Sequence, residues 1–237
     1  MPATSIREFA DNAVEPKVRG FLHQPELPNY DGMVLSHGAG SNAAAALLVA
    51  LAETFSAQGV TVLRCDLPYR QARSFGPPGP GDAARDRAGL TNALAAMRKV
   101  VSGRLFLGGH SYGGRQSSML CAELSKAELS QAELSQPEST WVTALLLLSY
   151  PLHPPRKPEQ QRTQHLPDLR TPTLFVQGTR DPFGSIAEME QALKMIPAKT
   201  RLLVMEGAGH DLGLKGKGTR EKLAATIFAQ WQELLPQ

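Results

Sequence analysis

The chain has 237 residues, of which 42% are hydrophobic and 20% charged, and its formal net charge is +3 at pH 7. This length suits one α/β domain and allows a large core that needs neither disulfides nor metal ions for stability. The small positive charge, without a clustered stripe of Lys and Arg, argues against a dedicated nucleic-acid-binding protein.

Strand-like and helix-like segments alternate along almost the whole chain. Short apolar or β-branched runs predict strands at residues 17–23, 32–36, 60–65, 104–107, 141–148, 173–177 and 201–205. Helical spacing predicts helices at residues 42–58, 82–102, 113–135, 186–195 and 219–235. The alternation predicts a single α/β domain over residues 1–237, with a mostly parallel sheet covered by helices on both faces.

Two long proline-rich loops interrupt this pattern, at residues 66–81 and 150–170. Each follows a predicted strand, so in a parallel sheet each leaves from a carboxyl end, where ligands bind. Long loops in compact domains are often functional. The alternative is that most of their residues are plain surface connections.

A short repeat occupies residues 122–136, which hold three copies of Ala-Glu-Leu-Ser followed by Lys or Gln. The five-residue period does not match the ~3.6-residue helical period, so it sustains no apolar stripe. Three short copies are also too few for a solenoid. We interpret the segment as a low-complexity helical extension that projects to solvent and has no catalytic role.

The strongest functional signal is Gly109-His110-Ser111-Tyr112-Gly113, which joins an apolar strand to a helix. In a G-x-S-x-G turn the serine sits on a sharp bend with its Oγ exposed, and the flanking glycines avoid clashes. The helix that follows brings backbone N–H groups and the positive end of its dipole beside the serine. We therefore predict that Ser111 is a catalytic nucleophile.

A serine nucleophile needs a base, and the base needs an acid that holds its tautomer. His210 lies between the last predicted strand and the last helix, which returns it to the sheet edge that carries Ser111. Asp181 follows another strand, and the order Ser111, Asp181, His210 suits such an elbow. Asp66, at the end of a further strand, is the reserve candidate for the acid. The alternative for Asp181 is that it only initiates a turn before Pro182.

Other side chains near these motifs are secondary candidates for the site. His110 lies inside the elbow, and we expect its side chain to point away from Ser111. His153 and His165 lie in the second long loop and are candidates to touch a substrate, although a single loop histidine is more often exposed or structural. Additional candidates to line the crevice are Tyr69, Arg70, Arg73 and Arg115, although a structural ion pair is the preferred role for Arg115.

The tetrahedral intermediate of an acyl transfer needs N–H donors for its oxyanion. We predict the backbone N–H of Tyr112 as one donor and that of Ala39, in the small-residue loop His37-Gly38-Ala39-Gly40, as the second. The alternatives for this loop are a phosphate cradle or a tight turn, but it lacks both the P-loop ending and G-x-G-x-x-G. The histidines are scattered and the cysteines unpaired, so no metal site is predicted.

The runs Leu35–Gly40, Gly108–Gly114, Gly178–Asp181 and Gly207–His210 together resemble the α/β-hydrolase superfamily over most of the chain. More narrowly, the chain resembles small lidless serine hydrolases near the dienelactone hydrolases, including predicted hydrolases similar to domains of KANSL-type chromatin complexes. Dienelactone hydrolases proper carry Cys at the elbow, so Ser111 favours ester hydrolysis. The resemblance implies no cofactor and an open site without a full lid domain.

These features predict a serine hydrolase that cleaves carboxylic esters of small or accessible acyl groups through an acyl-enzyme on Ser111. An amidase, peptidase or thioesterase with the same triad is an alternative, as is a non-catalytic interaction module of the same fold. The expected partner is a small-molecule acyl substrate, without nucleic acid or membrane, and the sequence leaves the oligomeric state open.

Cysteine content and apolar runs predict the compartment. Cys65 and Cys121 form no disulfide framework and suit a reducing environment. The first twenty residues contain charges and no apolar signal segment, and the run at 144–148 is too short to span a bilayer. We therefore expect a cytoplasmic protein.

Overall fold

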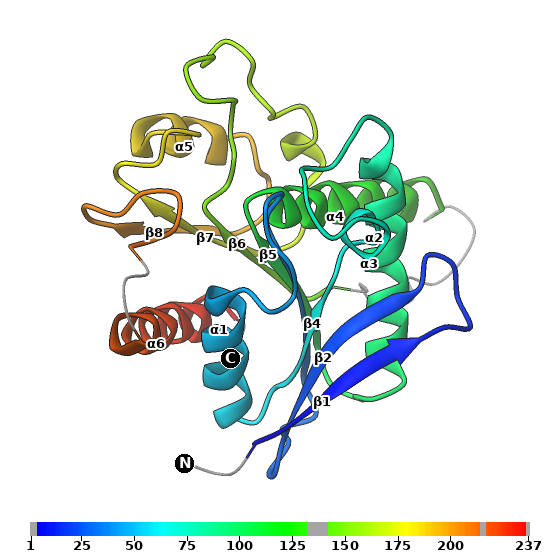
Figure 1. Ribbon diagram of the computed structural model, residues 1–237. Coiled ribbons are helices and arrows are strands. Elements are labelled where there is room, and N and C mark those ends of the chain that lie inside the picture. Colours follow the sequence, from blue (N-terminus) through cyan, green and yellow to red (C-terminus); the bar gives the residue numbers. More distant parts are fainter. Residues whose placement is uncertain (1–3, 132–141, 214–216, 236–237) are drawn as a thin grey trace.

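An eight-stranded sheet forms the centre of the computed structural model, which describes residues 4–131, 142–213 and 217–235 (Figure 1). The strands are β1 (Thr4–Asp11), β2 (Val18–Pro25), β3 (Gly32–Ser36), β4 (Thr61–Cys65), β5 (Leu105–His110), β6 (Ala144–Leu148), β7 (Thr173–Gly178) and β8 (Thr200–Met205). Their order is β1-β2-β4-β3-β5-β6-β7-β8. β2 is antiparallel to β1 and β4, and the other pairs are parallel. The predicted mostly parallel sheet is confirmed.

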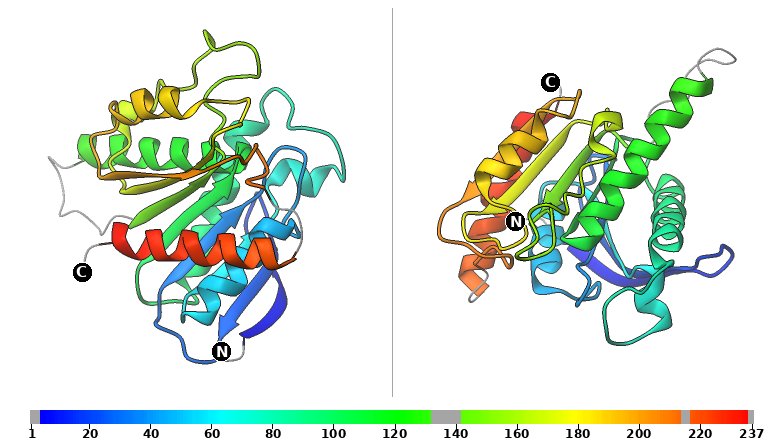
Figure 2. Two further views of the ribbon diagram at one scale, coloured as in Figure 1. Left: turned by 90° about the vertical axis from the view of Figure 1, so that its left-hand side faces the viewer. Right: turned by 90° about the horizontal axis from the view of Figure 1, so that it is seen from above.

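Helices cover both faces of this sheet, as predicted (Figure 2). They are α1 (Ala46–Ala57), α2 (Pro68–Ala72), α3 (Asp82–Arg98), α4 (Tyr112–Gln131), α5 (Ile186–Leu193) and α6 (Lys217–Leu234), with a 3₁₀ turn at Leu166–Asp168. One core cluster packs α1 and α6 against the sheet, and the other packs α3, α4 and α5 against the opposite face. Trp231 of α6 illustrates the first cluster, because its ring meets Phe55 and Phe106 edge-on.

The central strands are continuously buried because both of their faces are covered. All five residues of β3, β4 and β6 are buried, which explains their unbroken apolar runs. In the parallel register Ser36 lies opposite Gly109, and His110 lies opposite Leu148. The carboxyl ends of β3, β5 and β6 therefore meet at one edge, where the serine motif stands.

Several elements differ from the sequence-based expectation. β1 was not predicted, because this edge strand is largely exposed and lacks a regular alternation of apolar residues. The predicted loop 66–81 contains the short helix α2, which starts at Pro68. α1 starts at Ala46 rather than at residue 42, because the Asn42 side chain accepts a hydrogen bond from Ala44 N and forms a turn. The predicted strand 141–148 starts at Ala144, and Trp141 lies outside the described residues.

The repeat is helical as far as the structure describes it. Residues 122–131 continue α4, and residues 132–136 lie outside the described part of the chain. Cys65 and Cys121 are buried and free. Among the described residues, no helix combines the length and the apolar character that crossing a membrane requires.

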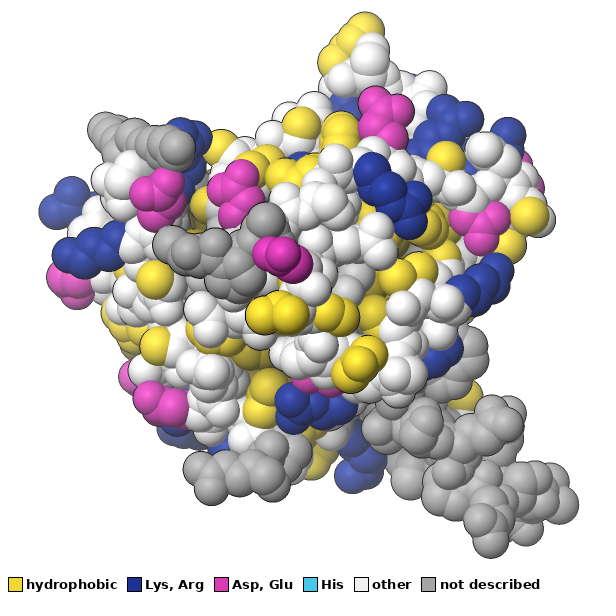
Figure 3. Space-filling model, turned by 90° about the horizontal axis from the view of Figure 1, so that it is seen from below, with side chains coloured by type: hydrophobic (Ala, Val, Ile, Leu, Met, Phe, Trp, Pro, Cys, Tyr) yellow, Lys and Arg dark blue, Asp and Glu magenta, His cyan; other side chains and the backbone are white. Residues whose placement is uncertain are grey.

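Charge is mixed on the face seen from below in Figure 3. Basic and acidic side chains alternate there with hydrophobic ones, and neither sign gathers into a single patch (Figure 3). This distribution agrees with the small net charge of +3.

Candidate active site

Ser111 occupies a sharp turn between the end of β5 and the start of α4. Its φ of 51° lies in the left-handed region that non-glycine residues rarely adopt. Two backbone hydrogen bonds hold it there, from Ser111 N to Leu148 O (2.8 Å) and from Arg115 N to Ser111 O (2.9 Å). Such strain is typical of functional turns that expose a side chain.

The glycines of the elbow are required by close packing. A Cβ on Gly109 would lie 2.4 Å from Ser36 Oγ, and a Cβ on Gly113 would lie 2.5 Å from His37 O. Both distances are far below van der Waals contact, so β3 and the start of α4 approach each other only because these positions lack side chains. This approach places the loop after β3 beside Ser111.

The three residues predicted as a triad form one hydrogen-bonded chain. His210 Nε2 lies 2.8 Å from Ser111 Oγ, and His210 Nδ1 lies 2.8 Å and 3.0 Å from the two carboxylate oxygens of Asp181. The Asp181 side chain is fully buried, whereas that of His210 is 24% exposed. With the proton on Nδ1, His210 donates to Asp181 and leaves Nε2 to accept the serine proton.

Asp181 is held by the turn that follows β7. Phe183 N donates to Asp181 Oδ1 (2.9 Å), and Asp181 N donates to Gly178 O (3.2 Å). The Phe183 ring lies 4.3 Å from the His210 ring, centroid to centroid, at a tilt of 34°. The turn therefore fixes the acid and also covers one face of the imidazole.

His110 supports the backbone of His210. Its Nε2–H donates to the His210 carbonyl (2.9 Å), and the two rings are 5.2 Å apart. Burial lowers the pKa of His110, while the hydrogen bond to the His210 carbonyl acts in the opposite direction. This role of His110 was not predicted from the sequence, where the only local signal was a histidine inside the elbow itself.

Hydrogen bonds from residues of α2 hold the loop after β3. Tyr69 Oη donates to Ala39 O (2.8 Å), and Arg70 donates to Ser41 O (2.7 Å) and Ala39 O (3.1 Å). A Cβ on Gly38 would lie 3.5 Å from Ser111 Cβ, so the loop borders the serine. The oxyanion roles of Ala39 and Tyr112 stay predictions. As the first residue of α4, Tyr112 has an N–H with no partner inside the helix.

A buried carboxylate joins this loop support to the elbow. Asp86 of α3 accepts hydrogen bonds from Tyr112 Oη (2.7 Å) and from Tyr69 N (3.0 Å). Asp86 is fully buried, and burial raises its pKa. Asp86 is not among the candidates predicted from the sequence, although an acid on the apolar face of a predicted helix was a usable signal.

Other candidates from the sequence are engaged elsewhere. Asp66, the reserve acid, accepts a hydrogen bond from Ala43 N (2.7 Å), so Asp181 alone of the two contacts His210. His153 contacts Glu188, and Arg73 pairs with Asp82. The expectation of an ion pair for Arg115 is wrong, because no described residue pairs with it and its Nε is buried without a partner.

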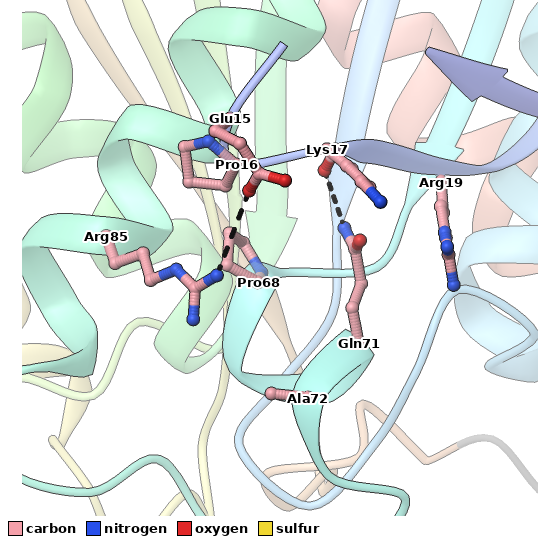
Figure 4. Close-up of a pocket in the computed structure, with 8 residues that line it drawn as sticks. All are labelled: Glu15, Pro16, Lys17, Arg19, Pro68, Gln71, Ala72 and Arg85. Carbon is pink, nitrogen blue, oxygen red and sulfur yellow. Dashed lines mark hydrogen bonds and ion pairs between the residues drawn. The ribbon is translucent and has the colours of Figure 1, made fainter. Parts of the chain in front are cut away.

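A separate polar hollow of about 220 Å³ lies between the turn after β1, α2 and α3 (Figure 4). Its lining contains none of the three triad residues. Gln71 spans it, donating to Lys17 O and to Asp66 O, both at 2.9 Å. These bonds anchor α2, the helix that fastens the loop after β3.

The described residues contain no group of three or more His, Cys, Asp or Glu side chains arranged to hold a metal ion.

Sequence comparison matches residues 30–233 to a family described as alpha/beta hydrolase domain. Dienelactone hydrolase from Anabaena variabilis has a similar structure, with a TM-score of 0.70, 22% identity and coverage of 98% of this chain and 99% of that one. Est1E from Butyrivibrio proteoclasticus has a TM-score of 0.68 and 15% identity, with coverage of 97% of this chain and 98% of that one. A lidless α/β serine hydrolase from Xanthomonas campestris has a TM-score of 0.62 and 15% identity, with coverage of 99% of this chain and 96% of that one. At sequence identities of 15% to 22%, these similarities show a shared fold and no more.

A curated protein, polyketide synthase ThaQ from Burkholderia thailandensis, is 52% identical over 52 residues. The match covers 22% of this chain and 2% of that protein, so it spans a very small part of the synthase.

Proposed function

Because the chain belongs to the alpha/beta hydrolase domain family, we propose that it is a serine hydrolase that cleaves carboxylic esters of small or accessible acyl groups through an acyl-enzyme on Ser111. The resemblance predicted from the motifs is confirmed for the family. The observation that carries the proposal is the relay of hydrogen bonds from Ser111 through His210 to Asp181.

The relay suits nucleophilic attack on an ester carbonyl. His210 Nε2 takes the proton as Ser111 Oγ bonds to the carbonyl carbon, and buried Asp181 stabilises the imidazolium that forms. The backbone N–H groups of Tyr112 and Ala39 donate hydrogen bonds to the carbonyl oxygen, on which negative charge develops. His210 then protonates the departing alcohol, which leaves an acyl group on Ser111. Water, activated by the same histidine, releases the acid and restores the serine.

The segment after β6 favours accessible acyl groups. Between β6 and β7 the chain contains irregular loop and the short turn Leu166–Asp168, in the place where larger relatives carry a helical lid. An open site exposes the elbow to small esters without a large closing motion. Amides and thioesters remain alternative substrates for the same relay.

Hydrolysis of short p-nitrophenyl esters by the purified protein tests this proposal. We expect turnover by the wild type and a loss of at least about 10³-fold in kcat for Ser111→Ala, because the nucleophile is removed. Ser102→Ala, which changes an exposed serine, is the control and should keep full activity. Absence of ester turnover by the wild type would contradict the proposal, and turnover of amides or thioesters alone would support the alternative substrates instead.

A further inference from the structure

Arg115 stands one helical turn after Ser111, with its N–H bonded to the Ser111 carbonyl at 2.9 Å. Side chains of an α-helix lean toward its N-terminus, so we expect the Arg115 side chain to extend toward the turn that carries the nucleophile. Its Nε is buried and lacks a hydrogen-bond partner, and no described residue forms an ion pair with it. A buried Nε–H without a partner among the described residues is unfavourable, so this position favours an anionic ligand that would accept its hydrogen bond.

Arg162 brings a second guanidinium to the same region. Tyr150 starts the loop that leaves β6 beside Ser111, and its Oη donates to Arg162 O (3.3 Å). Arg162 N donates to Leu152 O (2.8 Å), and one terminal nitrogen of the Arg162 side chain donates to Pro151 O (3.3 Å). Burial, and then the charge of Arg115, lower the pKa of Arg162. No carboxylate of the described residues pairs with Arg162.

The groups around the two arginines do not neutralise them. Burial, with the charge of Arg115 as the next cause, lowers the pKa of His165 to about 4, so this ring is neutral at pH 7. His165 Nε2 lies 2.8 Å from Ser118 Oγ. Burial raises the pKa of Tyr150 to about 12, so its hydroxyl stays protonated. Asp168, the acid next to this group, is paired with Lys126 at 2.8 Å.

We propose that Arg115 and Arg162 form a subsite for a carboxylate at the far end of the acyl chain, so that the substrates are monoesters of short dicarboxylic acids. The inference rests on the proposed function, because it assumes that Ser111 attacks the ester carbonyl, and it names the substrate class. A guanidinium presents a planar fork of donors that matches a carboxylate, and the two side chains supply the opposite charge. The free carboxylate of the substrate would supply the negative charge that no acid among the described residues supplies to Arg115 and Arg162.

Matched esters test the subsite. We would measure kcat/KM for mono-p-nitrophenyl succinate, glutarate and adipate, each against its uncharged methyl ester. We expect the wild type to prefer the best anionic ester by about 10- to 100-fold, the range of charge-assisted hydrogen bonds. Arg115→Met and Arg162→Met should lose this preference, because kcat/KM should fall about 10-fold or more further for the anionic ester than for the uncharged one, mainly through KM.

Arg156→Met is the matched control, because Arg156 lies exposed on the same loop. It should keep the preference. Thermal unfolding of Arg115→Met separates binding from a structural role, since removing a charged group whose Nε lacks a partner among the described residues should leave Tm unchanged or raise it. A lowered Tm with equal losses on both esters would overturn the subsite.

Calorimetric titration with glutarate provides a test that does not depend on turnover. We expect Kd to rise about 10-fold or more in Arg115→Met relative to the wild type. Equal affinity in the two proteins, or wild-type turnover without preference for the anionic esters, would overturn the subsite and leave the serine hydrolase proposal standing. A third result is a wild type that binds glutarate in an Arg115-dependent way but turns over no ester. This result would support the carboxylate subsite and contradict the proposed reaction.

Discussion

Asp181 shows how a single buried side chain controls the state of the imidazole. Its carboxylate is fully buried, lies 2.8 Å from His210 Nδ1, and accepts a further hydrogen bond from Phe183 N. A carboxylate at this place accepts only, so it requires the proton on Nδ1 and leaves Nε2 free for Ser111. The charge of Asp181 also stabilises the imidazolium after proton transfer.

Asp181→Asn should therefore keep the fold and lose most of the activity. The amide can donate to Nδ1 and so favours the wrong tautomer, which predicts a fall in kcat of about 10³- to 10⁴-fold. Steady-state kinetics with a short ester, together with circular dichroism, measure this. Asp211→Asn is the control, because Asp211 contacts Gly213 N rather than His210. Similar kcat values for the two variants would contradict the role of Asp181.

At the scale of elements, the short helix α2 ties the loop after β3 to the rest of the molecule. Tyr69 and Arg70 on one side of α2 hold the carbonyls of Ala39 and Ser41, and Gln71 anchors the helix to the segment before β2. Asp86 connects α2 to Tyr112 in the elbow. The two predicted oxyanion donors thus share one support.

Tyr69→Phe tests this support by removing one hydroxyl. The ring packing should persist, while Ala39 O loses its 2.8 Å bond from Tyr69 and the loop becomes less ordered. We expect kcat to fall about 10-fold with little change in KM, because oxyanion stabilisation acts in the transition state. Tyr30→Phe, at an exposed tyrosine, is the control. Equal kinetics in wild type and Tyr69→Phe would contradict the link between α2 and the loop.

The elements that could be predicted are those with a strong local pattern. β3, β4 and β6 are continuous apolar runs, and the elbow, Asp181 and His210 each follow a strand, so their meeting at one edge follows from parallel topology. β1 is a mostly exposed edge strand, and α2 is a five-residue helix inside a proline-rich stretch, so neither has a clear periodicity. The tasks of His110 and Asp86 depend on contacts between distant segments, which one sequence does not reveal.

For the whole molecule, buried neutral histidines make stability depend on pH. His23 on β2 is fully buried and accepts a hydrogen bond from Arg64 Nε (2.8 Å). Burial, followed by the charge of Arg64, lowers the pKa of His23 from 6.5 to about 4. Between these values the unfolded chain binds the proton and the folded protein does not, so the free energy of unfolding falls as pH drops from about 6.5 to 4.

His23→Gln should weaken this dependence, because glutamine can accept the bond from Arg64 and does not titrate. The pKa difference corresponds to up to about 3 kcal/mol between pH 7 and pH 4. Urea unfolding at pH 7, 5.5 and 4.5 measures it, with a flatter profile expected for the variant. Profiles that run parallel would contradict a neutral His23 in the folded state.

The central claim is that Ser111 is a nucleophile activated by His210. The most direct measurement is labelling with a fluorophosphonate, followed by intact-mass and peptide mass spectrometry. We predict one adduct per chain, located on Ser111, with no labelling of Ser111→Ala and a rate reduced at least about 100-fold in His210→Ala. An unlabelled wild type, or an adduct on another serine that persists in Ser111→Ala, would contradict the account.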